Sequence, residues 1–218
     1  MSASPPDVVA FRDLDLDHDD KLVDRLHSEV LAVSFSPDEL DDAETLARGL
    51  RGDSDAEVLA SVALGRDDFV LGGVVGAVYA PEGVLLLAYL AVRPDLRGRG
   101  VGTALIAHVA PRWYAHPAVR LALAEVHDPR AWSGIAGDDA LSLLRLYDRL
   151  GARVLGVPFV QPALGPGRAR APDFLLLAFH VDPNIELDGG SAVPAGIVGR
   201  FVRRYYGTAE GVGAPYDS

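Results

Sequence analysis

The sequence predicts a mixed α/β fold, in which helices flank a mostly antiparallel sheet of about seven strands. Two observations support this prediction. Short apolar runs separated by turn residues form a meander over residues 57–92, which is typical of antiparallel strands. A glycine-rich turn then leads into a helical pattern and another apolar run at residues 119–126, and a helical crossover of this kind makes two strands parallel.

The N-terminal half contains the meander and the helices that precede it. The expected elements are a strand at residues 8–12, helices near 20–33 and 37–50, and strands at 57–64, 69–79 and 84–92. Pro81-Glu82-Gly83 divides the last apolar stretch into two strand-length pieces. This stretch therefore predicts a hairpin and not a membrane span.

The C-terminal half alternates helices and strands. Val101, Leu105, Ile106 and Val109 recur on one helical face after the glycine turn, and residues 119–126 read as a strand. The next helix is expected to begin at Asp138 or Asp139 and to run to Leu150, with Gly151 ending it. Further strands are expected near 153–161 and 174–181.

The last part of the chain predicts an extension to this fold. We expect one domain over residues 1–182, and an extension over 183–218 with a helix at about 195–206 and a flexible tail from residue 207. Apolar residues of that helix recur at helical spacing, with arginines opposite. Such a helix packs on the body of its own chain or on a second subunit, so a homodimer remains open.

The amino-acid composition excludes several kinds of site and disfavours some classes of partner. The chain has no cysteine, which excludes disulfides, thiolate nucleophiles and cysteine-ligated zinc, and its six histidines lack the i, i+4 pairing of a metal site. A formal net charge of -11 disfavours nucleic acid and favours a cationic partner. No basic segment followed by an apolar one starts the sequence, so we expect a cytoplasmic protein without membrane attachment.

The segment Arg97-Gly98-Arg99-Gly100-Val101-Gly102 connects a predicted strand to a predicted helix. The first turn of a helix has backbone N–H groups without intrahelical partners, and these groups bind anions. Glycines leave room for a phosphate, and the two arginines add positive charge. The segment therefore predicts a phosphate site.

A second segment, Leu146-Tyr147-Asp148-Arg149-Leu150-Gly151, closes the helix after the next strand. Together the two segments resemble the paired signatures of the GNAT superfamily of acyl-CoA-dependent N-acetyltransferases. The first matches its R/Q-x-x-G-x-G/A loop and the second its L-Y-x-R-x-G pattern. The order of elements resembles this family from about residue 8 to residue 181, and the resemblance implies a sheet whose parallel pair is splayed.

The resemblance implies residues that bind acetyl-CoA, which would be a co-substrate, with no metal. Backbone groups of the loop would hold the pyrophosphate, and backbone groups at the end of the preceding strand would hold the pantetheine arm and polarise the thioester. These residues are Leu90, Ala91, Val92, Arg97, Gly98, Arg99, Gly100, Val101, Gly102 and Thr103. The family often has an asparagine before the tyrosine-bearing helix; here Asp139 is the candidate replacement, unless that contact is absent.

The resemblance also implies catalytic roles. Tyr147 occupies the position of the family's general acid, although a tyrosine on an apolar helical face can simply pack in the core. Glu125 is the acidic residue of an otherwise almost wholly apolar strand, and it is our candidate base for the acceptor amine. His127 is an alternative, and many family members have no dedicated base.

The sequence thus predicts an N-acetyltransferase that transfers an acetyl group from acetyl-CoA to a primary amine of a small-molecule or peptide acceptor, by direct attack in a ternary complex. One alternative is a catalytically silent acyl-CoA sensor or scaffold, which needs the loop but not Tyr147. Another is a phosphate-binding protein that does not bind CoA and shares only the turn. No acceptor is identified by the sequence.

Overall fold

The computed structural model describes residues 7–131, 137–188 and 192–211. Within it the chain forms two compact units. The first comprises Met1–Val78 and Leu87–Pro117, and the second comprises Tyr79–Leu86 and Ala118–Ser218. The strands follow the order β1-β2-β3-β4-β5-β8-β6, with β7 paired to β8.

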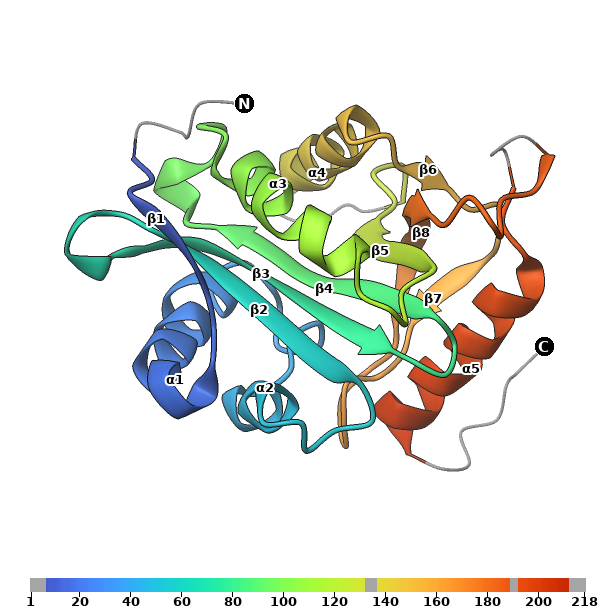
Figure 1. Cartoon of the computed structure of the whole chain (residues 1–218), viewed down its shortest axis with the longest axis horizontal. Coiled ribbons are helices and arrows are strands. Elements are labelled where there is room, and N and C mark those ends of the chain that lie inside the picture. The colour runs from blue at the N-terminus through green and yellow to red at the C-terminus, as the bar shows by residue number, and fades with distance from the viewer. Residues whose placement is uncertain (1–6, 132–136, 189–191, 212–218) are drawn as a thin grey trace. The chain divides into compact units, whose positions relative to one another are not determined.

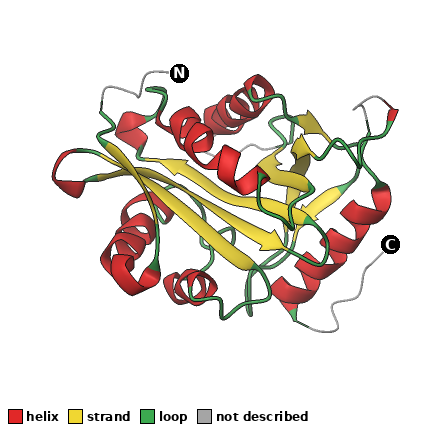
Figure 2. Ribbon diagram, in the orientation of Figure 1, coloured by secondary structure: helices red, strands yellow, loops and turns green. Residues whose placement is uncertain are grey.

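The first unit is built on an antiparallel meander. Its strands are β1 (Ala10–Asp13), β2 (Glu57–Leu64), β3 (Val70–Tyr79) and the larger part of β4 (Val84–Val92). Two antiparallel ladders join these strands, with Ala10 opposite Leu64 in one and Glu57 opposite Val78 in the other. The three strands of residues 57–92, coloured yellow in Figure 2, begin and end within one residue of their predicted limits. The turn between β3 and β4 contains Pro81-Glu82-Gly83, and the Gly83 N–H donates to the Tyr79 carbonyl at 3.0 Å.

Helices cover both faces of this meander. Its helical elements are α1 (Leu16–Arg25), the π-helix η1 (Leu26–Leu31), α2 (Ala43–Leu50), the short 3-10 turns η2 (Arg66–Asp68) and η3 (Pro94–Leu96), and α3 (Val101–Tyr114). Figure 1 shows α1 and α2 on one side of β1–β3 and α3 on the other. Val62 packs in the core with α1 and α2, whereas Phe11 stacks on His108 of α3 at 4.8 Å between ring centroids.

The prediction of a helix over residues 37–50 was wrong at its N-terminal end. The helix starts at Ala43, because the Asp42 carboxylate accepts a hydrogen bond from the Thr45 N–H at 2.7 Å and caps it there. Residues 26–31, predicted as part of one helix, form a π-helix in which the Ala32 N–H donates to the His27 carbonyl, five residues back.

The second unit is built on β5 and β8. Its elements are the start of β4, β5 (Leu121–His127), α4 (Gly137–Arg149), β6 (Arg153–Val154), β7 (Phe159–Gln161), β8 (Ala171–Val181) and α5 (Ala195–Glu210). β5 and β8 are antiparallel, and β4 and β5 form the predicted parallel pair, with the Gly83 carbonyl accepting from the N–H groups of Arg120 and Leu121.

The second unit differs from the prediction in several places, among them the start of β8, which lies at Ala171 and not near residue 174. The strand expected at 153–161 is divided into β6 and β7, because Gly156 and Pro158 interrupt the ladder. The last helix continues to Glu210, so residues 207–210, expected in a flexible tail, are helical. The tail beyond residue 211 lies outside the described residues, as do residues 132–136 of the insertion before α4.

In the described part of the chain, no helix is both long enough and apolar enough to cross a membrane. The same residues contain no group of three or more His, Asp or Glu side chains arranged to hold a metal ion.

Candidate functional site

The glycine turn has the backbone geometry of an anion site. Gly98 and Gly100 adopt left-handed conformations with φ of 75° and 87°. A Cβ atom on Gly98 would meet no atom within 4 Å, so the turn is open on that side. Gly100 is the N-cap of α3, and no side chain caps the helix. The N–H groups of the first turn, residues 101–103, are therefore available to an anion.

The two arginines of the turn contact the protein itself. Arg97 donates from Nε to the Val92 carbonyl at 3.2 Å and from Nη2 to the Ser34 hydroxyl at 3.3 Å. Arg99 pairs with Asp7 at 3.2 Å. Arg97 thus joins the turn to the last residue of β4. The backbone of the turn, more than its side chains, remains free to bind a phosphate.

The end of β4 carries the other predicted cofactor residues of the first unit. Ala91 is buried, and Leu90 and Val92 are partly buried. β3 approaches this end closely, since a Cβ atom on Gly72 would lie 2.8 Å from the Ala91 carbonyl oxygen. The absence of a side chain at Gly72 therefore determines where the backbone of residues 90–92 lies.

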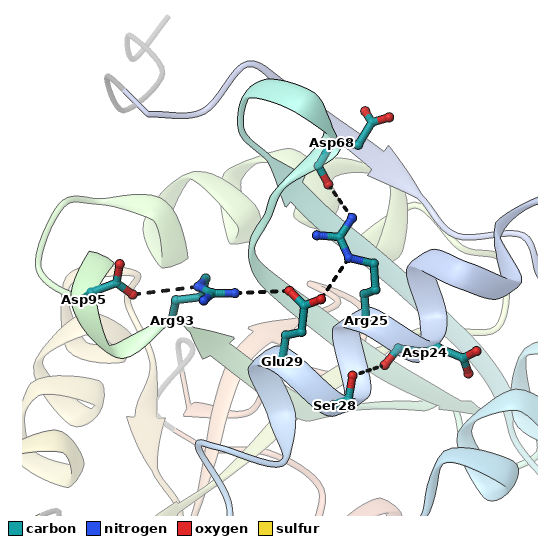
Figure 3. Close-up of polar contacts among 7 residues, drawn as sticks. All are labelled: Asp24, Arg25, Ser28, Glu29, Asp68, Arg93 and Asp95. Atoms are coloured by element: carbon teal, nitrogen blue, oxygen red, sulfur yellow. Dashed lines mark hydrogen bonds and ion pairs between the residues drawn. The ribbon is translucent and has the colours of Figure 1, made fainter.

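A charged cluster holds the residue that follows β4. Glu29 of the π-helix accepts from Arg25 Nε at 3.0 Å and from Arg93 Nη1 at 3.2 Å, and both guanidinium groups point toward it in Figure 3. The hydrogen bond from Arg25, with the charges of both arginines, lowers the pKa of Glu29. The Arg93 guanidinium also lies 4.3 Å from the centre of the Phe69 ring. The sequence interpretation missed this cluster, although the i, i+4 pair Arg25 and Glu29 was a signal for part of it.

Glu125 of β5 lies in a polar cluster inside the second unit. Its Oε2 atom accepts from Gln161 Nε2 at 2.8 Å and from the Tyr205 hydroxyl at 3.4 Å. Its Oε1 atom is buried and has no hydrogen-bond partner among the described residues. Burial raises the pKa of Glu125 to about 7, and the two hydrogen bonds oppose that rise. The carboxyl group is thus poised to exchange a proton near neutral pH.

Gln161 and Tyr205 were not predicted as site residues. Gln161 lies on β7, and Tyr205 lies on α5, which was expected to be an appendage. A buried glutamine ending a short apolar strand was a weak signal for the first. Nothing in the helical pattern distinguished Tyr205 from its apolar neighbours.

Tyr147 and the remaining candidates also lie in the second unit. Tyr147 is 3% exposed on α4, and its ring stacks on Phe179 at 6.3 Å between centroids. The His127 ring lies 4.0 Å from the ring of Phe174. Asp139 lies in the first turn of α4, and its side chain is outside the described part of the structure.

The structure thus brings the candidates together in two groups. The turn and the end of β4 adjoin in the first unit, where Arg97 links them. The second unit contains Glu125, with its two donors, and Tyr147. The first group has the chemistry of an anion site and the second has a buried acid–base group.

Comparison with known proteins gives consistent results. A family model for the acetyltransferase (GNAT) family matches residues 22–151, more than half of the chain. A protein from Bacteroides thetaiotaomicron assigned to the GNAT family superposes with a TM-score of 0.64 at 18% identity, covering 91% of this chain and 99% of that one. No curated protein matches the sequence.

Two further solved structures share the fold. The ribosomal-protein-S18-alanine N-acetyltransferase of Escherichia coli gives a TM-score of 0.52 at 17% identity, covering 79% of this chain and 95% of that one. An aminoglycoside 6'-N-acetyltransferase complexed with coenzyme A gives a TM-score of 0.54 at 17% identity, covering 80% of this chain and 98% of that one. At these identities the likeness concerns the fold alone.

Proposed function

Because the chain belongs to the GNAT acetyltransferase family, we propose that it transfers an acetyl group from acetyl-CoA to a primary amine of a small-molecule or peptide acceptor. The observation that carries this proposal is the uncapped start of α3 behind two left-handed glycines. Backbone N–H groups in this arrangement bind phosphate, and a coenzyme A pyrophosphate requires such a site.

In the proposed reaction the amine attacks directly in a ternary complex. The amine nitrogen forms a bond to the thioester carbonyl carbon, the carbon–sulfur bond breaks, the nitrogen loses a proton and the thiolate gains one. Glu125 takes the proton from the amine, and Tyr147 supplies one to the sulfur. A base with a pKa of about 7 suits the first role, because part of it is ionised at neutral pH.

The donor would be held by the first unit. The N–H groups of residues 101–103 bind the pyrophosphate, and the backbone of Leu90–Val92 binds the pantetheine arm and polarises the thioester carbonyl. The Arg97 and Arg99 guanidinium groups, already bonded within the protein, fix the turn and add positive potential beside it.

The acceptor would be cationic. The formal net charge of -11 favours the approach of amines, which are protonated in solution. Two proteins of the same fold are described by their acceptors, a ribosomal-protein alanine and an aminoglycoside. We therefore propose a peptide N-terminus and an aminoglycoside as the first acceptors to assay.

Calorimetric titration with acetyl-CoA tests the proposal. We expect binding to the wild type and a loss of at least about ten-fold in Gly100→Glu, whose carboxylate would occupy and repel the phosphate site. Gly52→Glu is the matched control, since Gly52 is also left-handed, with φ of 80° and no atom within 4 Å of an added Cβ. Equal binding by Gly100→Glu and the wild type would assign the donor to another site.

Release of free thiol in the presence of amines tests catalysis. Tyr147→Phe should lower kcat about a hundred-fold while leaving acetyl-CoA affinity unchanged, because it removes only the proton donor. A silent acyl-CoA-binding protein would bind acetyl-CoA, release no thiol with any amine and be indifferent to this substitution.

A further inference from the structure

Three side chains from separate elements meet in the second unit: Glu125 of β5, Gln161 of β7 and Tyr205 of α5. Gln161 and Tyr205 are each 7% exposed, so the two side chains that donate to the Glu125 carboxylate are themselves held in place by burial. Both donate to the same oxygen, Oε2, at 2.8 Å and 3.4 Å. An asymmetric arrangement of this kind distinguishes the two oxygens of one carboxylate.

The other oxygen, Oε1, is buried and has no hydrogen-bond partner in the part of the chain that is described. A buried carboxylate oxygen without a protein partner is costly, and in native structures such an atom is explained by a bound water or ion or by a catalytic role. Because two donors occupy Oε2, Oε1 is the atom that remains to accept a proton or an N–H group.

The described contacts of the cluster include apolar and aromatic side chains. β8 places Leu176 opposite Glu125, and the Tyr205 ring stacks on Phe201 at 5.6 Å and meets Tyr79 edge-on at 6.2 Å. These contacts fix the position of the Tyr205 hydroxyl. The other titratable group on this strand face is His127, two residues along β5.

We propose that Gln161 and Tyr205 are positioning residues for Glu125, holding one carboxylate oxygen so that the other receives the acceptor's proton. This inference rests on the proposed acetyl transfer. It extends the functional part of the chain beyond residue 151, where the family match ends, and gives α5 a part in catalysis. The hydroxyl and amide act through Glu125 and need no contact with either substrate.

Each donor stabilises the ionised carboxylate, so the loss of either one should raise the pKa of Glu125 further. Tyr205→Phe and Gln161→Met remove the donors with little change in volume. Tyr206→Phe is the matched control: Tyr206 is the next residue on α5, and its hydroxyl donates to the Val160 carbonyl instead of Glu125. Circular dichroism and thermal melting establish that each variant is folded.

The first readout does not require turnover. The protein is labelled with 13C at the glutamate carboxyl carbons, the Glu125 signal is assigned by its loss in Glu125→Gln, and the signal is titrated. We expect its midpoint to rise by about half a unit in Tyr205→Phe and about one unit in Gln161→Met, with no shift in Tyr206→Phe. Unmoved midpoints in both donor variants overturn the proposal.

The second readout is the acidic limb of the pH profile of kcat/KM for the amine. It should move upward by the same amounts in the two donor variants and disappear in Glu125→Gln. An NMR midpoint that moves while the acidic limb stays fixed places Glu125 off the reaction path, which overturns the inference and leaves the acetyltransferase intact. If the wild type acetylates no amine, the proposed function fails, and the NMR titration still decides whether the two donors act on Glu125.

Discussion

At the scale of single residues, Glu125, our proposed base, connects the proposed function with the stability of the fold. Its pKa is raised by burial from 4.5 to about 7, whereas in the unfolded chain it returns to the ordinary value. Well below pH 4.5 the carboxyl group is protonated in both states. Between these two values the unfolded state ionises while the native state keeps its proton, so the native state loses stability as the pH rises.

This pH dependence of the native state's stability leads to a prediction. Between about pH 4 and about pH 8, the free energy of unfolding of the wild type should fall relative to Glu125→Gln, by up to about 3 kcal/mol, since one pKa unit corresponds to about 1.4 kcal/mol. Urea denaturation at the two pH values measures it. A difference between the two proteins that does not change with pH would contradict the raised pKa.

At the scale of elements, the contact of β3 with the end of β4 determines the backbone proposed to hold the pantetheine arm. Gly72→Ala would place a methyl group 2.8 Å from the Ala91 carbonyl oxygen, and that backbone must then shift. We expect a loss of about 1–3 kcal/mol in stability and a weaker affinity for acetyl-CoA, measured by denaturation and calorimetry.

The neighbouring glycine is the control for this prediction. A Cβ atom on Gly73 would lie 2.3 Å from Leu26 Cδ1, so Gly73→Ala overpacks a helix side chain and leaves the end of β4 untouched. Its stability should fall, while the acetyl-CoA affinity of the folded protein should not. If both variants bind acetyl-CoA like the wild type, the end of β4 does not contribute to donor binding.

Elements also show what the sequence can and cannot predict. The strands at residues 57–92 were predicted almost to the residue, because turn residues and apolar runs are local signals. The glycine turn was predicted for the same reason. The π-helix was not, because its five-residue hydrogen bond leaves no pattern distinct from that of an α-helix.

The cluster of Glu125, Gln161 and Tyr205 shows that the sequence alone also predicts only part of the candidate site. The sequence singled out Glu125 as a candidate because a carboxylate is unusual in an apolar strand. Gln161 and Tyr205 are 36 and 80 residues away, and their contacts depend on how β7 and α5 pack. Tertiary contacts of this range are not encoded in local periodicity, and Tyr205 lies on the apolar stripe that the sequence assigns to packing.

At the scale of the whole molecule, α5 belongs to the same compact unit as β5 and β8. Its apolar face is buried, and Glu210 at its end pairs with Arg170 at 2.7 Å and accepts from the Ala163 N–H. A boundary of the acetyltransferase domain at residue 182 stays a prediction from the family resemblance. The packing indicates that the second unit needs the helix beyond that boundary.

Phe201 tests this dependence, because it is fully buried and meets Tyr79 edge-on at 5.3 Å between ring centroids. Phe201→Ala should cost about 3–5 kcal/mol in the free energy of unfolding, by the loss of apolar burial and the cavity it leaves. Arg203→Ala, on the exposed side of α5, should change it by less than about 0.5 kcal/mol. If a helix docked only loosely, both variants would unfold like the wild type. A large loss in the free energy of unfolding for Phe201→Ala alone, in a single cooperative transition, would support our inference. Residues 195–210 would then belong to the folded core that we propose to position Glu125.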